Sequence, residues 1–256
     1  MTDVATGLIV ILAAASVGAL GHQAKLRLFT REQEPGEGDG DKGTITEYVT
    51  MMVGVFYALI VGLSLVSVWE NRDNAEARVH TEASSLQEVY QLAGTLPDPA
   101  RQRIQSDATA YADYVVRTEW PLMDNESPLG EKGWTLLDNL RDAVTSYTAT
   151  TSAQNNVVGD AVNQLSTLAD ARRGREAAAA DRMPALLWVG LILGGVLTVA
   201  LTFGYGMKQH VSHVAMVMGL TGLIGFMMVL IFNLDNPFNQ GLGANSSAFT
   251  DLFPSA

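Results

Sequence analysis

Cysteine is absent from this 256-residue chain, and basic residues are scarce, with 16 Lys and Arg against 27 Asp and Glu. Without Cys there can be no disulfide, thiolate metal site or cysteine nucleophile. The net charge of −11 and the lack of any basic run longer than Arg172-Arg173 argue against a nucleic-acid partner, because phosphate recognition needs clustered Lys and Arg. The chain also lacks a phosphate-binding glycine loop and a Gly-x-Ser-x-Gly elbow, so we do not expect an enzyme.

Charge is also nearly missing from four long apolar stretches, and a helix needs about 20 apolar residues to cross a bilayer. The first stretch, with about 17 such residues, lies at the short limit. No ionisable residue lies well inside any of them, which argues against a proton-coupled transporter. The sequence therefore predicts an all-α integral membrane protein with four transmembrane helices, at residues 1–21, 48–69, 183–206 and 213–234.

The remaining segments are charged and polar. Residues 22–47 read as an amphipathic piece followed by a flexible acidic linker, and residues 235–256 as a C-terminal tail. Residues 70–182 show helical apolar spacing throughout and predict a helical extramembrane domain inserted between the second and third spans. No Pro or Gly follows Trp69 closely, so we expect the second span to continue into this domain as one helix. The domain's further helices are expected from an N-cap at Asp98 to Trp120, where Pro121 ends the helix, then at residues 134–144 and 153–181.

The predicted topology fixes which parts share a side of the membrane. An even number of spans puts both termini together, and a domain between spans two and three shares their side. Basic residues flank both ends of the spans and favour neither face strongly. We expect the helical domain and both termini on the cytoplasmic side of the inner membrane, with the lipid bilayer as the surrounding partner.

The second span carries one face that could line a pore. A monomer with four spans has little room for a water-filled path, so a pore would require a homo-oligomer. Phe56 and Ile60 would form an apolar neck, and Ser64 and Ser67 a polar lining. Small residues spaced by four in the spans allow close helix packing, either within the chain or between subunits. The alternative is that this face only packs against other helices and lines no pore. The face consists of Val53, Phe56, Tyr57, Ile60, Ser64 and Ser67.

Five separated motifs, in this order, resemble a bestrophin-like family of bacterial four-span membrane proteins of unknown function. They are Trp69-Glu70-Asn71-Arg72-Asp73, Leu96-Pro97-Asp98-Pro99-Ala100-Arg101, Glu119-Trp120-Pro121, Asp170-Ala171-Arg172-Arg173 with Arg175, and Leu234-Asp235-Asn236-Pro237-Phe238. The family is distantly similar to the bestrophins, which are pentameric anion channels, calcium-gated in animals, with the pore lined by the second span. The resemblance thus implies a homo-oligomer, a pentamer, that conducts small inorganic ions.

The charged residues of these motifs are compatible with two roles, ion pairing between helices and metal binding. Glu70, Arg72 and Asp73 on the helix leaving the membrane, with Arg172, Arg173 and Arg175 on the returning helix, could form interhelical ion pairs that fix the domain or couple it to the spans. Alternatively, Glu70, Asp73 and Asp235 could bind a metal ion. The long acidic run that binds calcium in animal bestrophins is absent here, so calcium gating is doubtful and no cofactor is expected to be required.

Two functions follow from the sequence. One is a bestrophin-like channel, anion-selective by resemblance, although an acidic entrance would favour cations. The other is a non-conducting membrane sensor or scaffold that uses the helical domain. The channel requires an oligomer with a continuous water-filled path through the membrane, whereas the sensor or scaffold does not.

Overall fold

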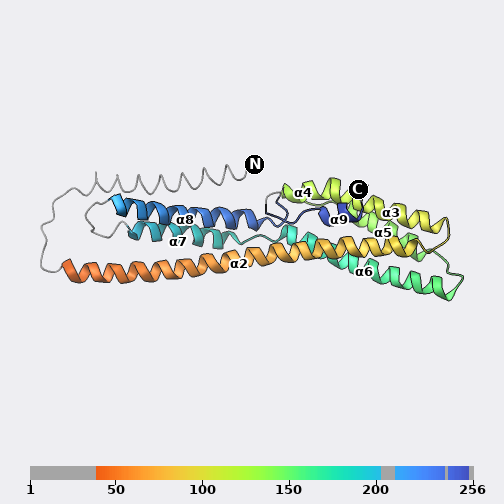
Figure 1. Ribbon diagram of the computed structural model, residues 1–256, viewed down its shortest axis with the longest axis horizontal. Helices are drawn as coiled ribbons and strands as arrows, with labels where there is room; N and C mark the ends of the chain where they lie inside the picture. The colour runs from red at the N-terminus through yellow and green to blue at the C-terminus, as the bar shows by residue number, and fades with distance from the viewer. Residues whose placement is uncertain (1–38, 203–210, 240–241, 254–256) are drawn as a thin grey trace. The chain divides into compact units, whose positions relative to one another are not determined.

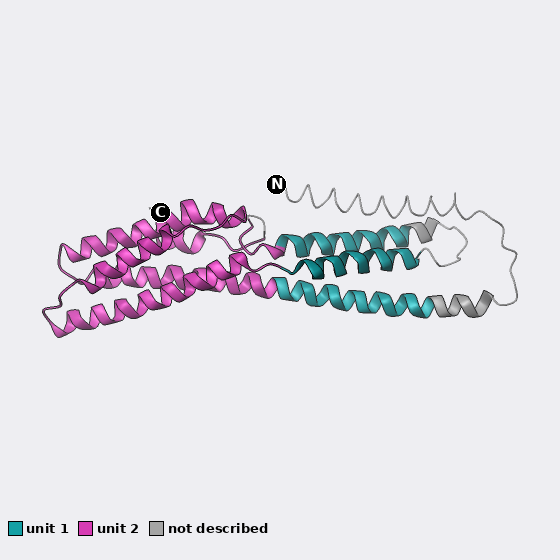
Figure 2. Ribbon diagram, turned by 180° about the vertical axis from the view of Figure 1, so that it is seen from behind, with its two compact units in different colours: residues 1–68, 183–233 teal, residues 69–182, 234–256 magenta. Residues whose placement is uncertain are grey.

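The computed structural model describes residues 39–202, 211–239 and 242–253, and these contain helices and no strand. They divide into two compact units, one of residues up to 68 with 183–233, the other of residues 69–182 with 234–256 (Figure 2). The predicted first span, 1–21, and most of the predicted linker lie outside the described residues. The all-α prediction is confirmed for the part of the chain that the structure describes.

The first unit is built from three apolar helices (Figure 1): α2 (Asp39–Ala93), of which only the residues up to 68 belong to this unit, α7 (Ala185–Thr202) and α8 (Val211–Asp235). Within the described ranges these are the helices long and apolar enough to cross a membrane. α2 and α8 include the second and fourth predicted spans, and α7 covers residues 185–202 of the third, whose residues 203–206 lie outside the described residues. Because only 11–22% of each apolar window is buried inside the chain, lipid or other protein must cover most of this surface.

Helix α2 is 55 residues long and has no break. It continues from the apolar segment into the second unit, as predicted, because no proline interrupts it. It begins at Asp39, inside the segment predicted as a flexible linker, and that part of the linker prediction is wrong. The helix ends at Ala93, after which a turn with Gly94 N–H bonded to the Gln91 carbonyl leads to Pro97.

The second unit is a helical bundle with an apolar core, containing the rest of α2, α3 (Ala100–Tyr114), α5 (Lys132–Thr145) and α6 (Ser152–Ala180). Their buried faces follow the 3.6-residue spacing that predicted them. Thr151 caps α6 by accepting a hydrogen bond from Gln154 N–H. The α6 helix ends at Ala180, and a non-helical link, residues 181–184, precedes α7.

Two local predictions in this unit are wrong. Asp98 is not the N-cap of α3, because Pro99 occupies that position and no side chain caps the helix. Asp98 instead pairs with Arg101, at 2.9 Å. Pro121 does not end the helix either; it lies at the start of α4 (Trp120–Asp124), which continues from α3 through one π-helical turn, η1 (Val115–Glu119).

The π-turn explains how a proline is accommodated without a break. Proline in a regular α-helix clashes with the carbonyl four residues earlier and removes a hydrogen bond. In η1 the Trp120 N–H bonds to the Val115 carbonyl, five residues back, so the helix carries one extra residue just before the proline. The extra residue shifts the register of the residues from Trp120 onward relative to α3.

The C-terminal tail packs into the second unit and completes its core. The sequence analysis did not predict this packing. Phe238, Phe249 and Phe253 are buried in its core. Phe238 packs edge-to-face on Trp120, with ring centroids 5.7 Å apart. The Asn236 side chain explains the Asn-Pro-Phe motif, because its amide donates to the Asp124 carbonyl and its oxygen accepts from Phe238 N–H.

Candidate functional site

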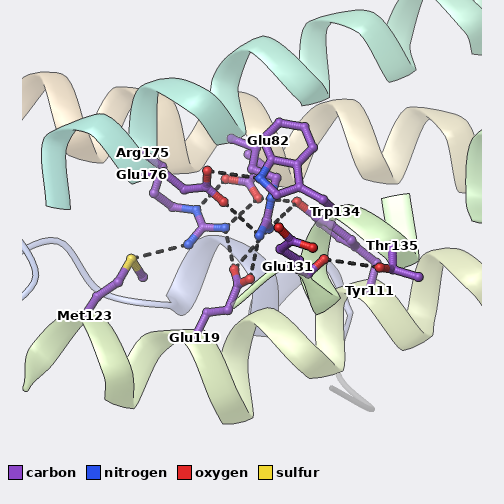
Figure 3. Close-up of polar contacts among 10 residues, drawn as sticks. Glu82, Tyr111, Glu119, Met123, Glu131, Trp134, Thr135, Arg175 and Glu176 are labelled. Atoms are coloured by element: carbon purple, nitrogen blue, oxygen red, sulfur yellow. Dashed lines mark hydrogen bonds and ion pairs between the residues drawn. The ribbon is translucent and has the colours of Figure 1, made fainter. Parts of the chain in front are cut away.

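Four charged side chains meet in the interior of the second unit (Figure 3). Arg172 and Arg175 come from α6, Glu82 from α2 and Glu119 from η1, and all four are fully buried. We call them the buried quartet. Burying one charge is very costly, so buried ions occur where partners and hydrogen bonds offset the lost hydration. Two cations and two anions meet here, and the part-buried Glu176 adds a third carboxylate, 2.8 Å from Arg172 Nη2.

The two arginines bridge the two carboxylates. Arg175 Nε donates to Glu82 Oε2 at 2.6 Å, and its Nη2 donates to Glu119 Oε2 at 2.8 Å. Arg172 holds Glu119 with two hydrogen bonds, of 2.5 and 3.0 Å. Tyr111 joins the quartet by donating its hydroxyl to Glu82 at 2.6 Å and accepting from Arg172 at 3.1 Å. The quartet therefore ties α2, α3, η1 and α6 into one bundle.

The surrounding charges and hydrogen bonds shift the pKa values of Glu119 and Tyr111 in opposite directions. Burial alone would raise the pKa of Glu119, but the hydrogen bond from Arg172 and the charges of both arginines outweigh burial and lower that pKa. Burial and the neighbouring Glu82 carboxylate raise the pKa of the Tyr111 phenol well above 10. Tyr111 thus stays a neutral hydroxyl, and Glu119 stays ionised near neutral pH. Neither state suits a proton-transfer group.

A tryptophan and a glycine close the quartet from α5. The Arg172 guanidinium lies 5.1 Å from the Trp134 ring, whose indole N–H donates to Glu176 at 3.1 Å. A side chain at Gly133 would overlap Arg172 Nη2 and Glu119 Oε1. Glycine is therefore required at this position so that the helix can approach the ion pairs.

In the first unit, the predicted pore face of α2 is divided. Phe56 and Ile60 are 63% and 48% exposed, and Ser67 is also exposed, whereas Val53 is half-buried. Tyr57 and Ser64 are buried inside the unit, at 7% and 8% exposure. The six residues share one arc of the helix, and one edge of that arc turns towards α7.

Comparison with protein families gives a match to the Bestrophin-like domain over residues 12–249. The chain belongs to the Bestrophin-like family. No functionally curated protein matches it. The resemblance seen in the five motifs is thereby confirmed.

Solved structures show the same fold as this Bestrophin-like chain. A crystal structure of a bacterial bestrophin homologue from Klebsiella pneumoniae, a single-site variant, has a TM-score of 0.68 at 15% identity and covers 99% of this chain and 96% of its own. A second variant of that homologue has a TM-score of 0.65 at 15% identity, covering 98% of each chain. At such identity the likeness establishes the fold.

The structure distributes the predicted ion-pair residues of this Bestrophin-like chain differently from the sequence reading. Arg172 and Arg175 do pair between helices, but with Glu119 and Glu82. Arg72 pairs with Asp73 and Glu76 on its own helix, and its Nε donates to the Leu242 carbonyl. The exposed Arg173 pairs with Asp170, and Glu70 is exposed.

The structure does not assemble the three predicted metal ligands, Glu70, Asp73 and Asp235. Among the residues that the structure describes, no three His, Asp or Glu side chains lie close enough to hold a metal ion. A metal at these carboxylates stays an untested prediction for the chain in its assembled form.

Sequence reasoning missed Glu82, and underused Glu119. Glu82 lies on the apolar stripe of α2 between Val79 and Leu86, where a charge signals a buried partner. Glu119 belongs to a recognised motif and lies four residues after the buried Val115, on the buried face of its helix, a signal that the sequence reasoning did not use. Both carboxylates serve to hold the bundle together.

Proposed function

We propose that this Bestrophin-like chain forms a homo-oligomeric ion channel whose pore is lined by α2. The observation that carries the proposal is the family match over residues 12–249, together with a bestrophin fold over nearly the entire chain. By family resemblance the oligomer is a pentamer and the conducted ions are anions. Conduction is proposed to need no bound cofactor.

The surface of α2 supports this role. Its apolar window is 11% buried within the chain, so most of its side chains remain for lipid and for neighbouring subunits. Phe56 and Ile60, one turn apart and both exposed, are suited to form an apolar neck, with Ser67 a further two turns along as a polar lining residue. Tyr57 and Ser64 are already used for packing inside the subunit and drop out of the proposed lining.

Localisation follows from the apolar helices. We propose that the chain lies in the inner membrane, with the helical unit of residues 70–182 and both termini on the cytoplasmic side. Labelling of single cysteines tests this orientation directly, because the chain has no cysteine of its own. Cysteine at the exposed Glu88 should react with a membrane-impermeant maleimide only after the cell membrane is opened.

Ion flux from liposomes tests the channel. Purified protein should dissipate a chloride gradient, and Phe56→Ala and Ile60→Ala should change the rate or the chloride-to-potassium preference. Leu186→Ala, an equally apolar and highly exposed position on α7, is the matched control and should leave flux unchanged. Absence of flux under both gradients, in folded and inserted protein, would rule the channel out.

The second candidate is a non-conducting sensor or scaffold. It is favoured by one observation, the unbroken α2, which runs from the apolar segment into the helical unit as one helix. Inserted protein without flux, whose helical unit still responds to changes in bilayer composition, is the result that this candidate expects.

A further inference from the structure

Tyr57 lies in a notch made by two successive glycines of α7. A Cβ atom built on Gly194 would come within 2.7 Å of the Tyr57 ring, and one built on Gly195 within 2.8 Å of its hydroxyl oxygen. Real Cβ atoms do not approach so closely, so both glycines are required for the ring to sit there. The same Cβ on Gly195 would be 3.3 Å from Ile224 of α8, which places the hydroxyl end of the ring near that helix.

The hydroxyl of Tyr57 is not satisfied in this position. It is buried and has no hydrogen-bond partner in the structure as far as its described residues extend. The surrounding helices are apolar and suited to a membrane, so no bulk water offsets the loss. An unpaired buried hydroxyl is destabilising, and such groups in native structures call for a physical explanation.

Packing and hydrogen bonding therefore oppose each other at Tyr57. The glycine notch holds the ring by shape, whereas the hydroxyl gains a partner only if the ring leaves. A contact balanced in this way can have two states that differ little in free energy. Phe56 and Ile60 flank Tyr57 on the exposed side of α2, so a rotation of α2 that frees Tyr57 must also re-aim both of them.

We propose that Tyr57 is the residue that positions the pore face of α2. It does so by packing its ring reversibly into the Gly194–Gly195 notch, and we call this packed position the seat. With the ring seated, Phe56 and Ile60 keep the positions seen here. With the ring released, its hydroxyl finds a hydrogen-bond partner and the neck residues turn. The effect on conduction rests on the proposed channel function; the seat itself does not.

Fluorine NMR of 3-fluorotyrosine-labelled protein in lipid nanodiscs tests the seat without any conduction. The signal that disappears in Tyr57→Phe identifies Tyr57 among the seven tyrosines. We expect two exchanging Tyr57 signals. A single Tyr57 signal that no condition splits or moves would overturn the proposal.

Three variants give the direction of the effect. Tyr57→Phe removes the unpaired hydroxyl and should favour the seated ring by about tenfold, which raises the thermal midpoint. Gly195→Ala fills the notch and should shift the Tyr57 signal to the released form. Gly190→Ala is the control, because a Cβ on this glycine of the same helix meets nothing within 4 Å, and it should leave the signals unchanged.

The outcomes separate the two proposals. If the seat exists and the protein conducts, Tyr57→Phe and Gly195→Ala should change flux in opposite directions. If the seat exists without flux, the channel fails and the seat stands. A lower thermal midpoint in Tyr57→Phe would show that the hydroxyl is already paired in the seated form, and would overturn the inference.

Discussion

At the scale of the residue, the buried quartet makes the strongest prediction. Glu119→Gln keeps the size of the side chain but removes the carboxylate that both buried arginines share, which leaves Arg172 with the part-buried Glu176 and Arg175 with Glu82. Breaking a buried ion pair on one side costs about 3–5 kcal/mol, and we expect a loss of that order in the free energy of unfolding of the helical unit. Chemical denaturation followed by tryptophan fluorescence measures it. Glu88→Gln, an exposed glutamate on α2, should change stability by less than about 0.5 kcal/mol.

The lowered pKa of Glu119 also predicts a pH dependence. A carboxylate whose pKa is lower in the folded than in the unfolded state stabilises the fold fully above the unfolded value, about 4.3. This contribution is lost as the pH falls through the lower, folded value. Thermal midpoints of the wild type should therefore drop below about pH 4.3. Glu119→Gln should show a weaker drop, and an equally steep one would contradict the assignment.

Gly133 provides an independent check on the same cluster. Gly133→Ala should destabilise the helical unit, because the added methyl group overlaps Arg172 and Glu119. Gly130→Ala makes the same chemical change nearby, where a Cβ meets nothing within 4 Å, and should be tolerated. Equal midpoints for the two variants would contradict the close packing of α5 against the quartet.

At the scale of the element, the π-turn sets the register of Trp120 and α4 relative to α3. Deleting Thr118, an exposed residue of η1, would restore regular helical register, so that Glu119 and Trp120 could no longer both keep their contacts. We expect a destabilisation about as large as that of Glu119→Gln, measured by the same denaturation. Thr118→Ala keeps the register and should have little effect. A deletion variant as stable as the wild type would show that the π-turn has no such role.

The elements also show which sequence signals were sufficient. The part of α2 beyond Trp69 and the helix α5, predicted at residues 134–144, were predictable because their apolar residues recur at helical spacing. The predicted N-cap at Asp98 and the predicted helix end at Pro121 were wrong, because capping and helix termination are local preferences that neighbouring contacts override. Glu82 and Glu119 could not be paired with Arg175 and Arg172 from sequence alone, because the pairs are 93 and 53 residues apart.

At the scale of the whole molecule, exposure of apolar surface predicts self-association. Native mass spectrometry from detergent should show an assembly of 27.4 kDa subunits, with five copies if the proposed pentamer is right. Assembly is expected because the apolar face of α2 is left open within one chain. Phe56→Ala should change flux and leave the subunit number unaltered. A monomer at every concentration tested would contradict the oligomeric channel.

The sequence by itself determined the helical class, the apolar helices and the family, because each of these depends on local composition, periodicity and short motifs. Only the tertiary structure decided that the tail completes the helical unit, that Arg172 and Arg175 are neutralised by Glu119 and Glu82, and that Tyr57 turns inward while Phe56 stays exposed. The physical reason is that burial and charge pairing depend on which distant surfaces meet. A helical face defines a set of neighbouring side chains, and packing then selects which of them are covered.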